Sequence, residues 1–345
     1  MKAVSVYIRL NNITLNFCER FLVESSWDTF TDTAFIVVPN VIFKAETSNA
    51  TVGLDSLLQK GDPVEIRAGY NKSFDTLETI FKGFISKVKT GTLVEIGCED
   101  AMYALKQKNL VSKVFKNATL KTLIDYITDR TNIETKLIDD TAGLGDWVIE
   151  NYSELNSVKV LEKLKGEPYG FVSYIKDGVL NVGVPYDATG TTHYLLKELN
   201  FAGDDDLKNE ANDTLRVLKG ISIQRDNSRI IKYATKIDGV ITISDAISNG
   251  ELRTLNVQYQ TADQLEATLK RVYQTTSFTG LQGSFPTFGE PVIRYNDWIK
   301  LRDLKNPERD GTYKVRSVVT EMTVSGGLRQ NVTVDFGITE VEANT

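Results

Sequence analysis

Few residues in this chain of 345 amino acids are of the types that carry catalysis. Its one histidine, His193, lies in a polar stretch, so a serine–histidine–aspartate arrangement would depend on that residue alone. No G-x-S-x-G motif accompanies it, and a single histidine cannot form a histidine-rich metal site. We therefore expect His193 to have a surface or capping role, and we assign no catalytic residue.

The two cysteines, Cys18 and Cys98, are far apart and have no metal-type spacing. Thiols of this kind are usually buried, and they stay reduced in a cytoplasm. The densest charge run, Asp204–Asp206, lacks the glycine and the distal glutamate of a calcium loop, which predicts a solvated acidic loop. The sequence also contains no P-loop, G-x-G-x-x-G or H-E-x-x-H motif, so we expect neither a metal nor a cofactor. The 46 acidic residues leave a glycosidase-type pair of carboxylates open, although no pair stands out.

The bulk composition narrows the class of protein. Apolar residues make up 41% and charged residues 25% of the chain, which is typical of a soluble globular protein, and the length predicts at least two domains. The net charge of −6 argues against nucleic-acid binding through phosphate contacts. The N-terminal alternation over 4–10 is a strand pattern, and no apolar run approaches the roughly 18 residues that span a bilayer. We expect no membrane insertion and a chain that stays in the cytoplasm where it is made.

Residues 1–105 have the pattern of short strands separated by turns, which predicts a first antiparallel β-barrel domain. The strand-like runs lie at 4–10, 35–38, 63–66, 84–88 and 93–96. We take the run at 35–38 as a strand buried on both faces. A short helix is predicted at 101–107.

Residues 106–200 are expected to form a small mixed α/β domain. One helix is predicted over 119–130, because Leu120, Leu123, Ile124 and Ile127 fall on one helical face. A second helix is predicted to start at Ser157 as N-cap and to stop at Gly166. Asp177-Gly178 between two strand-like runs predicts a β-hairpin.

Residues 201–345 are expected to form a second β-barrel domain with a helical insertion around 236–285. The insertion rests on a helix predicted from Thr261, which forms a capping-box pair with Gln264. The strands predicted around it lie at 215–224, 237–243, 298–301, 313–319, 322–324 and 331–336. The predicted fold class is therefore α+β and β-rich, with two similar antiparallel barrels and an interposed α/β domain.

An internal repeat links the two β-rich ends. Asp62–Arg67 (DPVEIR) matches Asp297–Arg302 (DWIKLR), and each block is followed by a turn glycine, a strand, another glycine turn and a further strand. Chance similarity remains an alternative to duplication, because antiparallel strands between glycine turns look alike whatever their origin.

The order of these segments resembles a family of tail proteins. The run Phe81–Val88 (FKGFISKV) followed by Val94–Leu105 (VEIGCEDAMYAL) is similar to the late control protein D group, which includes Mu-like and T-even phage baseplate hubs and the N-terminal part of VgrG spikes. Gly289–Arg302 and Gly311–Val315 (GTYKV) resemble the closing barrel of that family. Two departures are Asn296-Asp297, where the family often has Pro-Gly-Asp, and an end at Thr345, without the oligonucleotide-fold and needle parts of VgrG.

The resemblance implies a structural tail baseplate hub subunit and no enzyme. Three copies with two barrels each would form a homotrimeric, pseudo-six-fold ring that joins the tail tube to a central spike made by a separate chain, and DNA would pass through without specific binding. Its place would be the virion tail baseplate of a phage or phage-like contractile particle, assembled in the bacterial host cytoplasm. The alternatives are a tail-associated cell-wall hydrolase and a carbohydrate-binding β protein.

Overall fold

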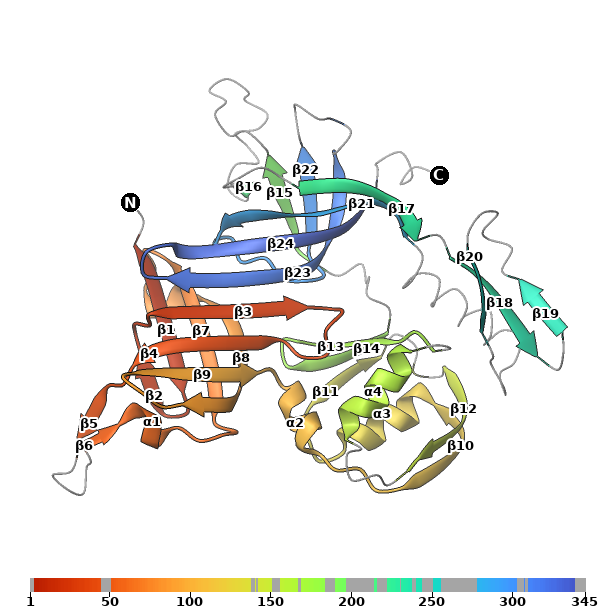
Figure 1. Ribbon diagram of the computed structural model, residues 1–345, viewed down its shortest axis with the longest axis horizontal. Coiled ribbons are helices and arrows are strands. Elements are labelled where there is room, and N and C mark those ends of the chain that lie inside the picture. The colour runs from red at the N-terminus through yellow and green to blue at the C-terminus, as the bar shows by residue number, and fades with distance from the viewer. Residues whose placement is uncertain are drawn as a thin grey trace. The chain divides into compact units, whose positions relative to one another are not determined.

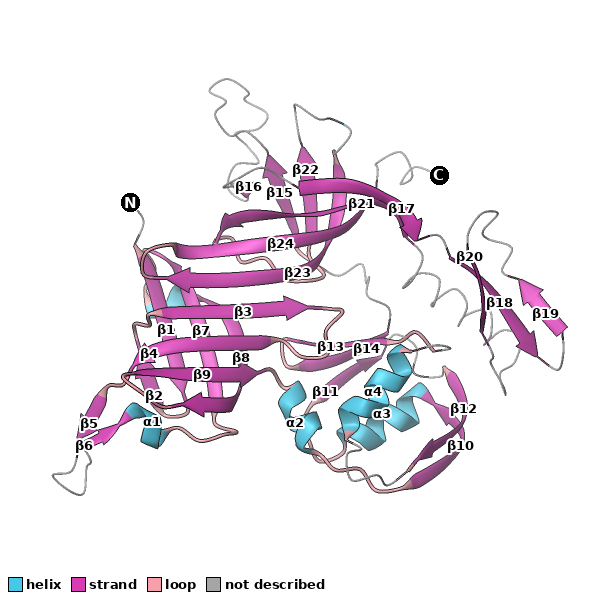
Figure 2. Cartoon of the chain, in the orientation of Figure 1, coloured by secondary structure: helices cyan, strands magenta, loops and turns pink. Residues whose placement is uncertain are grey.

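The computed structural model describes residues 3–44, 51–137, 140, 142–150, 156–166, 169–183, 190–196, 214–215, 222–229, 231–237, 240–243, 251–255, 278–302, 307 and 310–338. Strands dominate these residues, and the helices are short (Figure 2). Contacts divide the chain into two compact units: Met1–Tyr103, Thr189–Ile223 and Gln282–Thr345 form the first, and Ala104–Ala188 and Gln224–Leu281 form the second. The run Asp204–Asp206 and the helix predicted from Thr261 lie outside the described residues.

One large, mostly antiparallel sheet organises the first unit (Figure 1). Its N-terminal strands are β1 (Val4–Leu10), β2 (Ile13–Leu15), β3 (Arg20–Ser26), β4 (Thr33–Pro39), β7 (Pro63–Tyr70), β8 (Glu78–Lys89) and β9 (Leu93–Glu99). Its later strands are β15 (Thr192–Leu196), β16 (Thr214–Leu215), β17 (Ser222–Arg229), β21 (Phe278–Phe288), β22 (Trp298–Arg302), β23 (Gly311–Thr323) and β24 (Gly327–Ile338). The division between the units falls within β17, after Ile223, and within β21, after Leu281. The short elements β5 (Ile42–Lys44), β6 (Thr51–Gly53), α1 (Leu54–Leu57) and the 3₁₀ turn Phe74–Thr76 lie between β4 and β8 in the chain.

A single apolar core lies between the N-terminal strands. The sheet folds over, so that β3, β4 and β9 cross in front of β1 and β7 (Figure 1). Alternate side chains of these strands point inward, as a half-buried sheet requires. The larger members of the core are Ile8, Leu10, Phe21, Val23, Ile36, Val38, Ile66, Phe81, Ile85, Val94 and Ile96.

The second unit contains the helices predicted over 119–130 and from Ser157 to Gly166. Its elements from α2 to β14 are α2 (Met102–Gln107), β10 (Lys113–Thr119), α3 (Leu120–Thr128), β11 (Glu134–Leu137), β12 (Gly143–Ile149), α4 (Ser157–Lys165), β13 (Val172–Lys176) and β14 (Val179–Gly183). The predicted stripe Leu120, Leu123, Ile124 and Ile127 of α3 is buried, and Thr119 caps the helix together with Thr122. Asn156 caps α4 instead of Ser157, whose hydroxyl donates to the carbonyl of Ile127. The cap prediction was therefore wrong by one residue.

The predicted hairpin at Asp177-Gly178 is confirmed. Both residues have positive φ, 52° and 83°, which is the two-residue turn that suits the twist of the flanking strands β13 and β14. β14 also pairs in parallel with β11. A separate three-stranded sheet consists of β18 (Ile231–Ile237), β19 (Val240–Ile243) and β20 (Glu251–Leu255).

The predicted β-rich α+β class is confirmed, whereas two finer expectations need correction. The predicted strands 313–319 and 322–324 are one strand, β23. The run at 35–38 is not buried on both faces, because Phe35 is 36% exposed while Ile36 and Val38 are buried. The division into barrels at residues 1–105 and 201–345, with an α/β domain at 106–200, stays a prediction, since the pairings of the described strands leave the sheet open.

The two ends of the chain share one strand order. The N-terminal strands run β2-β1-β7-β8-β9-β4-β3, and the later strands run β16-β15-β22-β23-β24-β21-β17. We call these sets the first and the second repeat. One difference is that β1 pairs antiparallel with β7, whereas β15 pairs parallel with β22.

A shared turn precedes β7 and β22. In the first repeat Asp62 accepts the N–H of Gln59 on its carboxylate at 2.8 Å, and in the second Asp297 accepts the N–H of Arg294 at 2.8 Å. Gly61 (φ 93°) and Asn296 (φ 67°) hold equivalent positions in the left-handed region. Each donates its N–H to the neighbouring long strand, Gly61 to Ile85 at 2.8 Å and Asn296 to Val315 at 2.9 Å.

Register and bulge are also shared. Pro63 faces Phe84 across β7 and β8, and Trp298 faces Lys314 at the equivalent place across β22 and β23. The pairing of β8 with β9 shifts between Ile85 and Lys87, and that of β23 with β24 shifts between Val315 and Ser317. A bulge is a specific local feature of a sheet, and its recurrence at the same distance from the same turn favours duplication over chance.

The left-handed position explains why asparagine stands at 296, where the first repeat has a glycine. Its side-chain amide is buried and has no hydrogen-bond partner among the described residues, so its backbone conformation accounts for the residue at this position. We expect Asn296→Gly to leave the free energy of unfolding unchanged or higher in urea titration. Asn296→Val should lower it by about 2 kcal/mol, because a β-branched residue is strained at positive φ. Equal effects of the two substitutions would contradict this account.

Candidate functional site

The two repeats are joined by a strand pair within the first unit. β3 of the first repeat lies antiparallel to the second half of β23, from Arg20 opposite Thr323 to Ser26 opposite Ser317 (Figure 1). The first half of β23 pairs on the same edge with β22. One edge of β23 therefore holds a strand of its own repeat and then a strand of the other repeat.

Charged side chains reinforce this junction. Arg20 and Glu321 form an ion pair at 2.7 Å across the two strands, where both side chains are largely exposed. Arg316, the extra residue of the bulge in β23, donates its Nε to Asp28 at 2.9 Å and lies over the ring of Trp27. Its carbonyl accepts the N–H of Trp27 at 3.3 Å. Arg316, at the bulge of the second repeat, therefore binds directly to Trp27 and Asp28 of the first repeat.

The equivalent bulge residue of the first repeat, Ser86, makes a contact within its own hairpin. Its hydroxyl donates to the carbonyl of Gly97 on β9 at 3.1 Å. Lys87 and Lys89, which follow on β8, are exposed, and Val88 is only partly buried. The residue equivalent to Val88 in β23 is Val318, which pairs with Ser25 of β3 and is 2% exposed.

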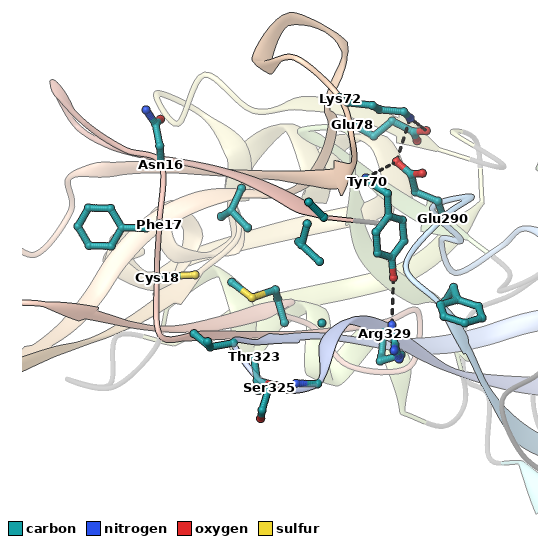
Figure 3. A pocket seen from close by; sticks show the side chains of 18 of the residues that line it. Asn16, Phe17, Cys18, Tyr70, Lys72, Glu78, Glu290, Thr323, Ser325 and Arg329 are labelled. Atoms are coloured by element: carbon teal, nitrogen blue, oxygen red, sulfur yellow. Dashed lines mark hydrogen bonds and ion pairs between the residues drawn. The ribbon is translucent and has the colours of Figure 1, made fainter. Parts of the chain in front are cut away.

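A pocket of about 1170 Å³ opens beside the junction between the repeats (Figure 3). Strand β1 and the loop between β2 and β3 line one side, and the β23–β24 hairpin lines the other. The apolar part of the wall includes Val4, Cys18 and Met322, and the exposed side chains Phe17 (48%) and Val324 (74%) also line it. The pocket therefore lies where the two repeats meet rather than within either of them.

The polar end of the pocket ties the repeats together. Glu290 accepts the N–H of Tyr70 at 3.1 Å and pairs with Lys72 at 3.0 Å. Arg329 donates to the hydroxyl of Tyr70 at 3.1 Å, and that hydroxyl donates to the carbonyl of Leu328 (Figure 3). The charges of Lys72 and Glu290 pair with each other, and Arg329 binds Tyr70, so these contacts hold the end of β7 against β24. The sequence carried no signal for this set, because Tyr70 and Lys72 are more than two hundred residues from Glu290 and Arg329.

Both cysteines are buried, as predicted. Burial, with a smaller effect of the nearby Glu19 carboxylate, raises the pKa of Cys18 to about 12. Burial raises the pKa of Cys98 to about 12 as well. The thiolate is the nucleophilic form, so neither thiol is activated at neutral pH, although Cys18 lines the pocket.

The expectation for His193 needs correction, because the residue is neither on the surface nor a cap. It lies in β15 with a side chain that is 6% exposed, and its Nε2 is 3.1 Å from the carboxylate of Asp297. Asp297 also accepts the backbone N–H groups of Thr191 at 3.1 Å and Arg294 at 2.8 Å. The pair therefore secures β15 to the shared turn, and a structural role accounts for the only histidine.

Two further carboxylates face each other at the start of β4. Asp32 donates its N–H to the carboxylate of Asp100 at 3.0 Å and accepts the N–H of Ser26 at 3.1 Å. Burial of the carboxyl group, together with the negative charge of Asp100, raises the pKa of Asp32 well above its usual range. Two adjacent carboxyl groups of this kind also occur in acid–base dyads. Here, however, both carboxylates accept backbone N–H groups next to the junction, from Ser26, Asp32 and Met102.

Groups of three or more histidine, cysteine, aspartate or glutamate side chains that could hold a metal ion are not found among the described residues. Nor does any described helix have the length and apolarity needed to cross a membrane.

Solved structures with the same architecture include tail proteins. A 43 kDa tail protein of prophage MuSo2 from Shewanella oneidensis matches at a TM-score of 0.61 and 12% identity, over 96% of this chain and 98% of that one. A tail protein from Neisseria meningitidis matches at 0.65 and 12%, over 96% of each chain. A component of the E. coli type VI secretion system, described as similar to T4 bacteriophage tail proteins gp27 and gp5, matches at 0.59 and 12%, over 96% of this chain and 77% of that one.

At sequence level, no protein-family model and no curated protein matches the chain. The structural matches have low identity but extend over nearly the whole chain, so they establish the fold. The chain has the fold of phage tail proteins, and the resemblance to baseplate hub proteins inferred from the sequence is confirmed at this level.

The shared turn allows a matched test of the His193–Asp297 contact. Asp297→Ala removes an acceptor from two backbone amides and from a buried imidazole, so we expect it to lower the free energy of unfolding by about 3 kcal/mol or more. Asp62→Ala at the equivalent, half-buried position should cost about 1 kcal/mol, since its carboxylate accepts from Gln59 and from the exposed side chain of Asn11. Equal losses in chemical denaturation would contradict the assigned role.

Asp32 should make stability depend on pH. Because its pKa is raised in the folded state, the folded protein favours the protonated carboxyl, and stability falls as the pH rises from about 4 through the raised pKa. Asp32→Asn, which stays neutral, is expected to be more stable than the wild type at pH 8, and the difference should shrink toward pH 4. Asp75→Asn, at an exposed position, serves as the control. A difference independent of pH, measured by thermal unfolding, would refute this assignment.

Proposed function

We propose that this chain is a structural subunit of a tail baseplate hub in a phage or phage-like contractile particle. Three copies form a pseudo-six-fold ring that joins the tail tube to a central spike made by another chain. The observation that carries the proposal is the duplicated strand order, with its shared turn and bulge, in a chain whose fold matches tail proteins over 96% of its length.

Duplication gives this role a physical basis. A subunit with two similar docking units converts three-fold symmetry into six nearly equivalent positions, and cyclic association closes such a ring. In this proposal the units are two barrels at residues 1–105 and 201–345, with an α/β domain at 106–200 and an insertion around 236–285. Such a mechanism depends on interfaces and needs no catalytic residue. The chain then belongs to the virion tail, assembles in the host cytoplasm, and lets DNA pass through the ring without specific binding.

Oligomeric state tests the proposal. Light scattering coupled to size exclusion is expected to give three times the subunit mass of 38.6 kDa, and negative-stain images should show a ring with a central hole. Addition of the tail tube protein should leave this stoichiometry unchanged. A monomer that clears peptidoglycan or binds glycans would overturn the proposal in favour of a tail-associated hydrolase or a carbohydrate-binding protein.

A further inference from the structure

We infer that the edge of β8 at Lys87–Lys89 pairs with strand β17 of a second copy of this chain. The inference rests on the proposed hub function and adds to it the surfaces through which subunits join. It follows from the junction between the repeats. The described strands form this junction once, at β23, and form no matching junction at the equivalent edge of β8.

The edge is defined by the equivalence of β8 and β23. In both strands the shared turn bonds to one edge just before the bulge, through Ile85 in β8 and Val315 in β23. Beyond the bulge, that edge of β23 takes up β3, beginning with Ser317 and Val318. Beyond the bulge of β8, Lys87–Lys89 pair on their other side with β9, and the described residues supply no strand to this edge.

The occupant is defined by the same equivalence. β3 is the strand that pairs with β4, and β4 pairs with β9. In the second repeat β17 pairs with β21, and β21 pairs with β24. β17 therefore holds the position of β3. Within the chain the described pairings do not join β17 to β8, so the equivalent junction must form between copies.

Physical chemistry favours such an edge as an interface. Unpaired strand edges bind other strands through their free backbone groups, and proteins guard them with lysines and keep them short. The edge of β8 has both features: Lys87 and Lys89 flank Val88, and the strand ends at Lys89, whereas β23 continues to Thr323. A guarded, short edge resists indiscriminate pairing and accepts a strand that neighbouring contacts hold in place. Because β8 of one copy meets β17 of the next, the interface is head-to-tail, which is the type of contact that generates a ring when the rotation between copies closes.

Cross-linking and amide exchange test the inference on the full chain. Lys87→Cys, combined in turn with a cysteine at Ser222, Gln224 or Asp226, should give covalent oligomers on oxidation at one register of β17. Asp75→Cys, at an exposed position in the turn before the opposite end of β8, is the control for the same partners and should give none. In hydrogen exchange, the segment 86–90 should exchange roughly tenfold or more slowly in the assembled oligomer than in the diluted subunit. The segment 317–323, already paired with β3, should be protected in both.

The outcomes separate the two proposals. An oligomer that forms with no cross-link at any β17 position, and with 86–90 exchanging as in the subunit, would overturn the inference and leave the ring intact. A chain that stays monomeric at all concentrations, with and without the tail tube protein, would overturn the hub function and the inference together.

Discussion

The antiparallel pairing of β3 with the second half of β23 is the constraint on which the first unit depends. It makes one sheet of two repeats that lie almost three hundred residues apart at this point. The shared turn, the bulge and the buried His193–Asp297 pair hold β22 against the first half of β23. The second half of the same edge is thereby left for β3. Backbone pairing of this kind supplies many directional bonds at once, whereas the exposed Arg20–Glu321 pair adds little by itself.

The polar groups that could carry chemistry are used for structure. Burial keeps the Cys18 thiol protonated, and Glu290, which also lines the pocket, is engaged by Tyr70 and Lys72. The Asp32–Asp100 pair holds backbone amides next to the junction. These hydrogen bonds hold the strands and loops beside the junction, because an unsatisfied buried carboxylate there would destabilise them.

The repeats are similar without being identical, and the differences lie at the edges. Arg316 reaches from the second bulge to Asp28, while Ser86 at the first bulge bonds within its own hairpin. β15 pairs parallel with β22, while β1 pairs antiparallel with β7. In the proposed assembly, these differences leave one junction within the chain and the other between copies.

Local features followed from the sequence alone. The stripe from Leu120 to Ile127, the hairpin at Asp177-Gly178 and the match of Asp62–Arg67 with Asp297–Arg302 depend on residues close together in the chain, where periodicity and turn chemistry are specific. Tertiary structure alone decided the partner of His193, the tie between Tyr70, Glu290 and Arg329, and the strand beside Val318. These contacts join residues from about one hundred to nearly three hundred positions apart, and a strand pattern specifies which face is buried but not which edge it meets.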